Sequence, residues 1–140
     1  MASIVDNPAG RLVTFRVVSP VDDANAGRAA ADLRRTIGSI GGTVVVCTDL
    51  TDARVFAPEV TEAFVKAMKA DNPKIERSAI LLSGRSAIFL LQLERMIREA
   101  ANPARRSFRD LHELGGWLVP VLSPDERTAL WAFLSEARLD

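Results

Sequence analysis

The stretch Thr43-Val44-Val45-Val46-Cys47-Thr48-Asp49-Leu50-Thr51-Asp52 decides the fold. Its first part is apolar or β-branched at nearly every position, which is typical of a central strand covered on both faces. Ser78-Ala79-Ile80-Leu81-Leu82 is a second run of this kind, and Ser83-Gly84-Arg85-Ser86 follows it. Each run leads through a polar turn into a helical pattern. The sequence therefore predicts parallel strands whose functional loops lie at their carboxyl ends.

Residues on the amino-terminal side predict two further strands. Residues 3–18 have strand composition at both ends and turn-forming residues at positions 6–10. We expect an edge hairpin in which Val13, Phe15 and Val17 face the core. The intervening residues, arginines included, are then expected on the more solvated face.

Helical patterns alternate with strands along the rest of the chain. Ser19 is a capping residue and Pro20 suits the first helical position, so a helix is predicted to begin there. Two further helices are predicted: one opened by Ala57-Pro58-Glu59 and ended by Asn72-Pro73, and one from about Arg85 to Ala100. A strand is predicted at residues 106–108, and Asp110 caps a short helix with a pliable end at Gly115-Gly116. A final helix begins with the capping box Ser123-Pro124-Asp125-Glu126. This order predicts a single α/β domain over residues 1–140. Its features are a mostly parallel central sheet of four to five strands, an N-terminal strand pair, helices packed on the sheet and an extra C-terminal helix.

The charge balance excludes one broad mode of binding. Eighteen Lys and Arg residues face eighteen Asp and Glu residues, so the formal net charge is zero. The long-range attraction that draws proteins to nucleic acid or acidic membranes is therefore missing, and we expect no nucleic-acid partner. Residues 1–8 lack a signal-peptide pattern, and no segment has the ~18 apolar residues that span a bilayer. We expect a cytoplasmic protein without an integral membrane segment.

Few residues carry the chemistry of a catalytic or metal site. Cys47 is the only cysteine and lies inside the valine run, where it serves as a small hydrophobe. His112 is the only histidine, and its neighbours Asp110 and Glu113 complete no metal-ligand set. No serine has nucleophile-elbow glycines around it, although a Ser-His-acid triad assembled in space stays open. The sequence predicts a non-enzymatic protein without metal or cofactor.

Two parts of the chain together resemble a known family of α/β domains. The strand pair at residues 3–18 and a helix precede Val44-Val45-Val46-Cys47-Thr48-Asp49-Leu50-Thr51, a strand that ends in an acid before a polar loop. Later, Phe108-Arg109-Asp110-Leu111-His112-Glu113-Leu114 runs into Trp117-Leu118. In these features the chain resembles the STAS family, the sulfate transporter and anti-sigma factor antagonist domains, and especially its compact stand-alone bacterial branch.

The resemblance implies a partner-binding role for the loop after the central strand. In the family's regulators this loop carries an Asp-Ser-Ser-Gly type motif whose serine is phosphorylated by a partner kinase. The loop from Asp49 to Ala53 departs from that motif and offers Thr51 as its candidate phosphorylation site, although nearby acids oppose a phosphate there. We expect a regulatory or scaffold module that binds a protein partner through Asp49, Thr51, Asp52 and, in the next helix, Glu59. A simpler interpretation is that Asp49, Thr51 and Asp52 shape a turn.

A second functional interpretation concerns the loop Ser83-Gly84-Arg85-Ser86. Its backbone amides and hydroxyls open a helix and could hold an anion, with Arg85 adding positive charge. The alternative function is thus a small anionic ligand or phosphate-binding protein, including an enzyme, that uses the crevice between the Asp49 and Ser83 loops. Ordinary helix capping by Ser83 is the simpler interpretation.

Two weaker alternatives involve apolar surface. Trp117 and Trp131 lie in the C-terminal helix region, where they fit a core and also a homodimer contact. Lipid carriage is a third function, because the STAS fold is similar in plan to CRAL-TRIO lipid-transfer domains. The short chain leaves little room for the cavity that lipid carriage needs.

Overall fold

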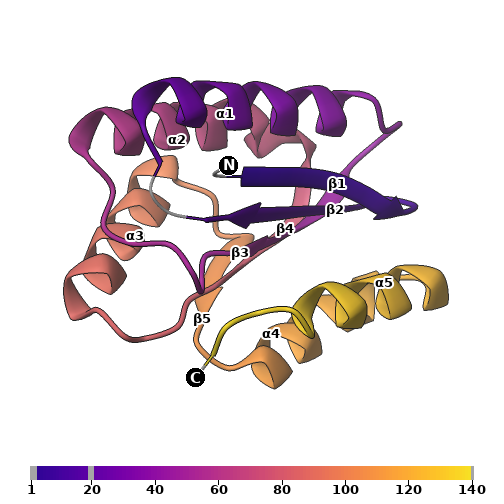
Figure 1. Ribbon diagram of the computed structural model, residues 1–140. Helices are drawn as coiled ribbons and strands as arrows, with labels where there is room; N and C mark the ends of the chain where they lie inside the picture. The colour runs from indigo at the N-terminus through magenta and orange to yellow at the C-terminus, as the bar shows by residue number, and fades with distance from the viewer. Residues whose placement is uncertain (1–2, 19–20, 140) are drawn as a thin grey trace.

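One sheet organises the molecule, and helices cover both of its faces (Figure 1). The computed structural model describes residues 3–18 and 21–139. Within these ranges the elements are β1 (Ser3–Ala9), β2 (Leu12–Val17), α1 (Asp23–Gly38), β3 (Val44–Asp49), α2 (Pro58–Asp71), the 3-10 turn η1 (Asn72–Lys74), β4 (Ile75–Leu81), α3 (Ala87–Ala100), β5 (Arg105–Phe108), α4 (Leu111–Leu118), the 3-10 turn η2 (Val119–Val121) and α5 (Pro124–Leu134).

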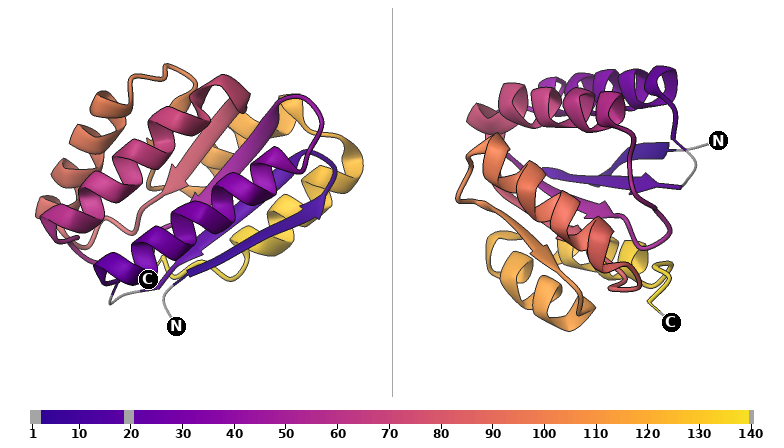
Figure 2. Two further views of the ribbon diagram at one scale, coloured as in Figure 1. Left: turned by 90° about the horizontal axis from the view of Figure 1, so that it is seen from above. Right: turned by 90° about the vertical axis from the view of Figure 1, so that its left-hand side faces the viewer.

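The described strands form a five-stranded sheet in the order β1-β2-β3-β4-β5. β1 pairs antiparallel with β2, and the later neighbours pair in parallel. Each parallel partner is the next strand along the chain, so the crossover helices α1, α2 and α3 gather on one face. Figure 2 shows α4 and α5 on the opposite face. The predicted α/β architecture is confirmed.

β3 is a central strand buried on both faces. Every residue from Val44 to Asp49 is buried. Val45 and Cys47 pack into the cluster beneath α4 and α5, whereas Val44 and Val46 pack into the cluster that contains Ile37 of α1. Both sets of alternate side chains need apolar neighbours, which explains the uninterrupted apolar run. Burial also raises the pKa of the Cys47 thiol, which makes it an inert core residue.

The predicted hairpin of β1 and β2 lies at one edge of the sheet, but the solvated face predicted for β2 is wrong. Leu12 and Thr14, expected on a solvated face, are only 0% and 4% exposed. Leu12 packs in the same cluster as Leu130 of α5, so that helix covers the face which alternation had assigned to solvent. β1 is the edge strand of the pair, and it continues to Ala9 through the predicted turn, with an irregular register after Asp6.

α1 begins later than its sequence pattern predicted. The helix starts at Asp23, and its N-cap is Asp22, whose Oδ1 accepts from the backbone N–H of Asn25 at 2.7 Å. A carboxylate acceptor satisfies a backbone donor that would otherwise be unpaired in the first turn. The predicted cap Ser19 and the predicted first helical residue Pro20 lie outside the described residues.

The capping box at the start of α5 is confirmed. Ser123 N–H donates to Glu126 Oε1 at 2.8 Å, and Glu126 N–H donates to Ser123 Oγ at 3.3 Å. Glu126 Oε2 also accepts from Arg11 N–H at 2.6 Å, which ties α5 to the β1–β2 turn. Burial alone would raise the pKa of Glu126, but the hydrogen bonds from Ser123 and Arg11 outweigh it and lower that pKa.

Gly115 corrects a prediction about α4. Together with Gly116 it was expected to loosen the end of the helix, yet Gly115 is buried inside α4. A Cβ at position 115 would lie 2.2 Å from Cη2 of Trp131. Gly115 therefore allows α5 to pack closely on α4, and its role is steric.

Candidate functional site

The loop after β3 is closed by side-chain hydrogen bonds. Asp49 Oδ1 accepts from both the backbone N–H of Thr51 at 2.9 Å and its hydroxyl at 2.7 Å. Asp49 and Thr51 are only 3% and 1% exposed. This arrangement matches the turn-shaping interpretation of the two residues.

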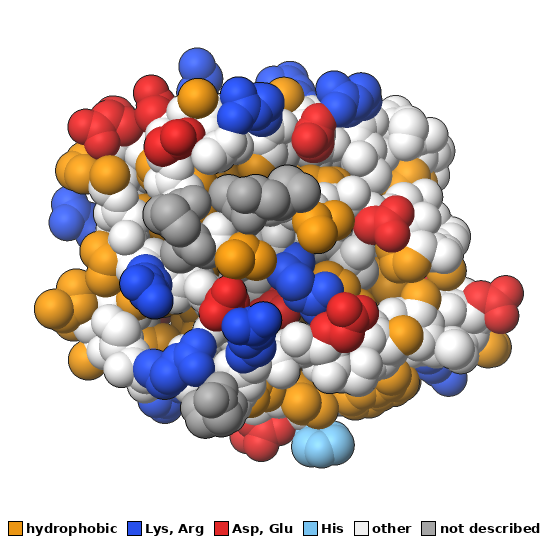
Figure 3. Space-filling view, viewed as in Figure 1, with side chains coloured by type: hydrophobic (Ala, Val, Ile, Leu, Met, Phe, Trp, Pro, Cys, Tyr) orange, Lys and Arg blue, Asp and Glu red, His pale blue; other side chains and the backbone are white. Residues whose placement is uncertain are grey.

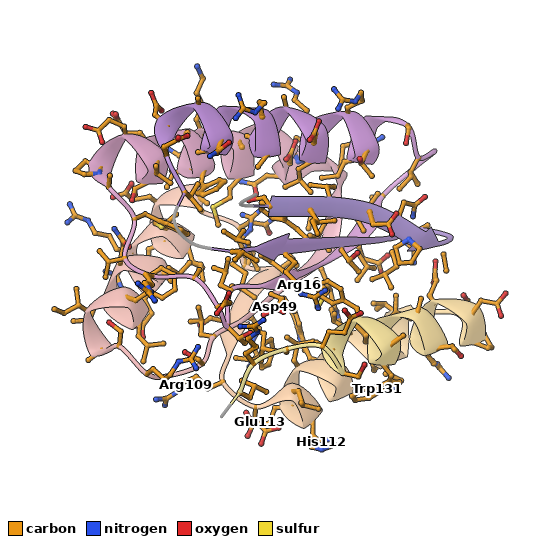
Figure 4. All side chains as sticks on the ribbon, in the orientation of Figure 1. Arg16, Asp49, Arg109, His112, Glu113 and Trp131 are labelled. Atoms are coloured by element: carbon orange, nitrogen blue, oxygen red, sulfur yellow. The ribbon has the colours of Figure 1, made fainter. Side chains whose placement is uncertain are left out.

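Arg16 of β2 neutralises Asp49 from the neighbouring strand. The parallel register places the two residues opposite each other, and Arg16 Nε donates to Asp49 Oδ2 at 2.8 Å. Arg16 Nη2 donates to the carbonyl oxygen of Phe133 at 2.7 Å, and its guanidinium lies 4.2 Å from the centre of the Phe133 ring. Figure 4 shows Arg16 and Asp49 adjacent at the strand ends. The sequence analysis did not predict this role of Arg16. The signal for it was an arginine placed among the apolar residues of a strand.

The segment after α5, residues 135–139, lies against this loop and is called the C-terminal segment below. Arg138 N–H donates to Thr51 Oγ1 at 2.8 Å, and Arg138 Nη1 lies 3.7 Å from Asp52 Oδ1. The hydroxyl of Thr51 therefore donates one hydrogen bond, to Asp49, and accepts one, from Arg138. Phosphorylation of Thr51 stays a prediction, and a kinase would reach this hydroxyl only after the C-terminal segment has moved.

The outer part of the loop, from Asp52 onward, is accessible. Asp52 is half-buried and Glu59 at the start of α2 is exposed. Val55 is 50% exposed, and Ile88 and Leu91 on the neighbouring α3 are 70% and 67% exposed. The four predicted partner-binding residues are thus divided between a buried pair and an accessible pair.

A groove of about 420 Å³ runs between α2 and α3, with Pro58 on one side and Ile88 and Leu91 on the other. Gln92 of α3 lines this groove and links α3 to the segment before α2. The Gln92 side chain accepts a hydrogen bond from Phe56 N–H at 2.9 Å and donates one to Phe56 O at 2.8 Å. Figure 3 shows hydrophobic side chains at the left edge of the molecule, where Figure 1 places α3. Ile88 and Leu91 lie off the buried stripe of α3, which was the sequence signal for this surface.

The loop at residues 83–86 lies beside the loop at residues 52–55, and a groove of about 510 Å³ separates them. The Arg85 guanidinium donates to the carbonyl oxygen of Thr51, which links the two loops. Gly84 has a positive φ of 79°, which glycine adopts readily. The cap of α3 is Ser86, whose Oγ accepts from Phe89 N–H at 3.1 Å, and the helix begins at Ala87. The helix, predicted from about Arg85, thus begins two residues later, and the predicted cap Ser83 is wrong.

A narrow, mostly apolar cavity of about 70 Å³ lies beneath α1, α2 and α3. An engineered cavity of about 150 Å³ holds one benzene molecule, so this cavity is too small for an acyl chain. The structure therefore offers no room here for the lipid-carriage alternative.

Asp71 and Arg105 line the polar end of that cavity, and sequence reasoning had singled out neither. Asp71 Oδ2 is buried without a hydrogen-bond partner among the described residues. Burial raises the pKa of Asp71 despite the nearby charges of Arg34 and Arg105, and burial lowers the pKa of Arg105 to about 10. The folded state thus favours the protonated carboxyl of Asp71. The contribution of this residue to stability is greatest at low pH and is lost as pH rises through the raised pKa.

The two tryptophans lie in the C-terminal helix region as predicted by their positions in the chain. Trp131 is 38% exposed, and the centre of its ring is 6.1 Å from that of His112. Trp117 is half-buried, with its ring centre 5.6 Å from that of Phe108. A homodimer through this region stays a prediction.

Comparisons with known proteins assign no family to the chain. No protein-family model matches the chain, and the search of curated proteins finds no match. Within residues 3–18 and 21–139, no helix is both long and apolar enough to cross a membrane. The same ranges contain no cluster of three or more His, Cys, Asp or Glu side chains that could hold a metal ion. The candidate site is accordingly defined by its contacts and exposed residues.

Proposed function

We propose that the chain is a non-enzymatic regulatory or scaffold module that binds a protein partner through the loop after β3 and the start of α2. The observation that carries this proposal is the exposure of three large apolar side chains, Val55, Ile88 and Leu91, together with the exposure of Glu59 and the partial exposure of Asp52. These five residues are called the partner surface. Large apolar side chains that gather on a surface mark contact sites, because a partner removes them from water.

The shape of the partner surface suits an amphipathic helix. Ile88 and Leu91 are three residues apart on α3 and share one face of that helix. The groove beside them has a volume of about 420 Å³, and we infer that apolar side chains spaced three and four residues apart on a partner helix occupy it. Arg95 and Glu99 line this groove, so its rim carries both charges and suits a partner with charged residues of both signs there.

The resemblance to the STAS family supports a signalling role of the anti-sigma factor antagonist type. Members of its stand-alone branch bind proteins at the loop that corresponds to Asp49–Ala53. The zero net charge likewise favours a protein partner over a nucleic acid. Because Asp49 and Thr51 are buried, we place the first contact on the partner surface, with the phosphorylation role of Thr51 secondary.

The double variant Ile88→Glu/Leu91→Glu is expected to abolish partner binding. Both positions are on the exposed face of α3, so charged residues there remain solvated and the fold is kept. Tagged wild type and variant are purified from the native host, and their partners are compared by mass spectrometry. With the partner purified, Kd is expected to rise at least about tenfold, a loss of about 1.4 kcal/mol.

The matched control is Ile4→Glu, which changes an apolar residue of similar exposure, 55%, on the edge strand β1. Retention of the partner by this control and its loss by the double variant support the proposal. Equal binding by wild type, control and double variant would reject the partner surface.

A second candidate function, binding of a small anion, is supported by the groove of about 510 Å³ between residues 52–55 and 83–86. In that case inorganic phosphate raises the melting temperature of wild type, since a ligand at a hundredfold excess over Kd adds about 2.7 kcal/mol. Arg85→Gln is expected to abolish the rise, whereas Arg127→Gln, on α5, is expected to keep it. A wild type that phosphate does not stabilise would eliminate this candidate.

A further inference from the structure

The C-terminal segment contacts the loop after β3 in the manner of a bound peptide. Its backbone donates one hydrogen bond, from Arg138 N–H to Thr51 Oγ1 at 2.8 Å. Its basic side chain at Arg138 lies 3.7 Å from the carboxylate of Asp52. On either side of Arg138, Ala137 and Leu139 pack half-buried against the apolar cluster beneath α4 and α5.

These contacts are weaker than those that hold the rest of the loop. The side chains of Arg138 and Glu136 are 71% and 72% exposed, so their ion pairs with Asp52 and Arg16 contribute little. The pair between Arg16 and Asp49 is far less exposed, at 20% and 4%. Segments with few buried contacts open before the core does. The C-terminal segment can therefore leave while the Arg16–Asp49 pair stays in place.

Departure of the segment would uncover one part of the loop selectively. The hydroxyl oxygen of Thr51 would lose the donor Arg138 N–H, and the carboxylate of Asp52 would lose its basic neighbour. Both groups would then be open to a donor and a cation from another chain. Asp52 also belongs to the partner surface, so the uncovered groups extend that surface inward.

We propose that the C-terminal segment is an autoinhibitory strap, which occupies in cis the site where a partner segment with a basic residue followed by an apolar residue binds in trans. The proposal rests on the proposed function, because it names the regulation and the partner chemistry of the same site. The strap and the partner segment need the same acceptor on Thr51 and the same carboxylate on Asp52, so they exclude each other. The strap lowers the partner's apparent affinity in proportion to the fraction of molecules in which it is closed.

The test compares wild type, Arg138→Pro and Arg138→Ala as full chains. Proline removes the N–H that Thr51 accepts, whereas alanine keeps this N–H and removes only the ion pair with Asp52. Hydrogen exchange reports opening at the Thr51 and Ala53 amides, which donate to Asp49 Oδ1 and Leu50 O. A labelled synthetic peptide of residues 135–139, Ser-Glu-Ala-Arg-Leu, reports binding in trans by fluorescence polarisation.

Arg138→Pro is expected to speed exchange at these amides about tenfold and to bind the peptide about fivefold more tightly than wild type. Arg138→Ala is expected to change both the exchange rates and the peptide affinity less than Arg138→Pro does. A peptide with Glu in place of its Arg is expected not to bind. Should Arg138→Pro fail to fold, Thr51→Val removes the acceptor of the same hydrogen bond and is expected to speed exchange at Ala53. Unchanged exchange, or equal affinity of all forms for the peptide, overturns the proposal. These readouts use no natural partner, so failure of the strap is distinct from failure of the Ile88 and Leu91 variants.

Discussion

Arg16→Met is expected to lower the free energy of unfolding by about 3 kcal/mol, as measured by urea denaturation. Removal of the guanidinium leaves the Asp49 carboxylate buried, at 3% exposure, without its countercharge. It also removes the donor to Phe133 O, which joins β2 to the end of α5. The two hydrogen bonds from Thr51 to Asp49 remain, which keeps the loss at the low end for a broken buried ion pair.

The control for this experiment adds Asp49→Asn to Arg16→Met. An amide keeps the oxygen that accepts from Thr51 but carries no charge, so the double variant is expected to recover at least about 1 kcal/mol. A loss below about 1 kcal/mol for Arg16→Met alone would contradict the assignment of Arg16 as the buried countercharge.

Gly115→Ala is expected to destabilise the protein by about 2 kcal/mol, although alanine is the better helix former. The added Cβ would lie 2.2 Å from Cη2 and 2.7 Å from Cζ2 of Trp131, so α4 and α5 must separate or the indole ring must move. Thermal unfolding of the purified variant measures the effect as a lower melting temperature.

Gly116→Ala is the matched control, because a Cβ there has no described atom within 4 Å. It is expected to stabilise α4 by about 0.5–1 kcal/mol through helix propensity alone. Trp131→Leu in the Gly115→Ala background is expected to relieve the clash, which a double-mutant cycle reports as a favourable coupling energy. Equal effects of alanine at positions 115 and 116 would show that Trp131 does not pack against Gly115.

The sequence predicted elements most reliably where local chemistry and burial agree. β3 is buried on both faces, so its apolar run identified it directly. The start of α5 was predicted because Ser123 and Glu126 satisfy each other's backbone donors within one turn. Pro58 and Pro73 likewise marked the two ends of α2.

Predictions failed where a distant element changes the environment of a residue. Alternation assigned Leu12 to a solvated face, but α5 covers that face from more than a hundred residues away. Gly115 gave a signal for flexibility, whereas its absent side chain accommodates Trp131. The packing of α5 on Leu12 and of Trp131 on Gly115 cannot be inferred from the residues next to them in the sequence. Local sequence does not specify which helix packs on which face of the sheet or against which other helix.

The candidate site shows the same division. By itself the sequence determined the α/β order, the acidic loop at the end of β3 and its position beside the loop at residues 83–86, because strand and turn patterns are local and parallel strands end at one edge. Only the tertiary structure decided which loop residues are accessible. Arg16 and Arg138 bury Asp49 and Thr51 from opposite ends of the chain, and the packing of α3 leaves Ile88 and Leu91 exposed. Exposure depends on contacts between distant segments, and these contacts exist only in the folded chain.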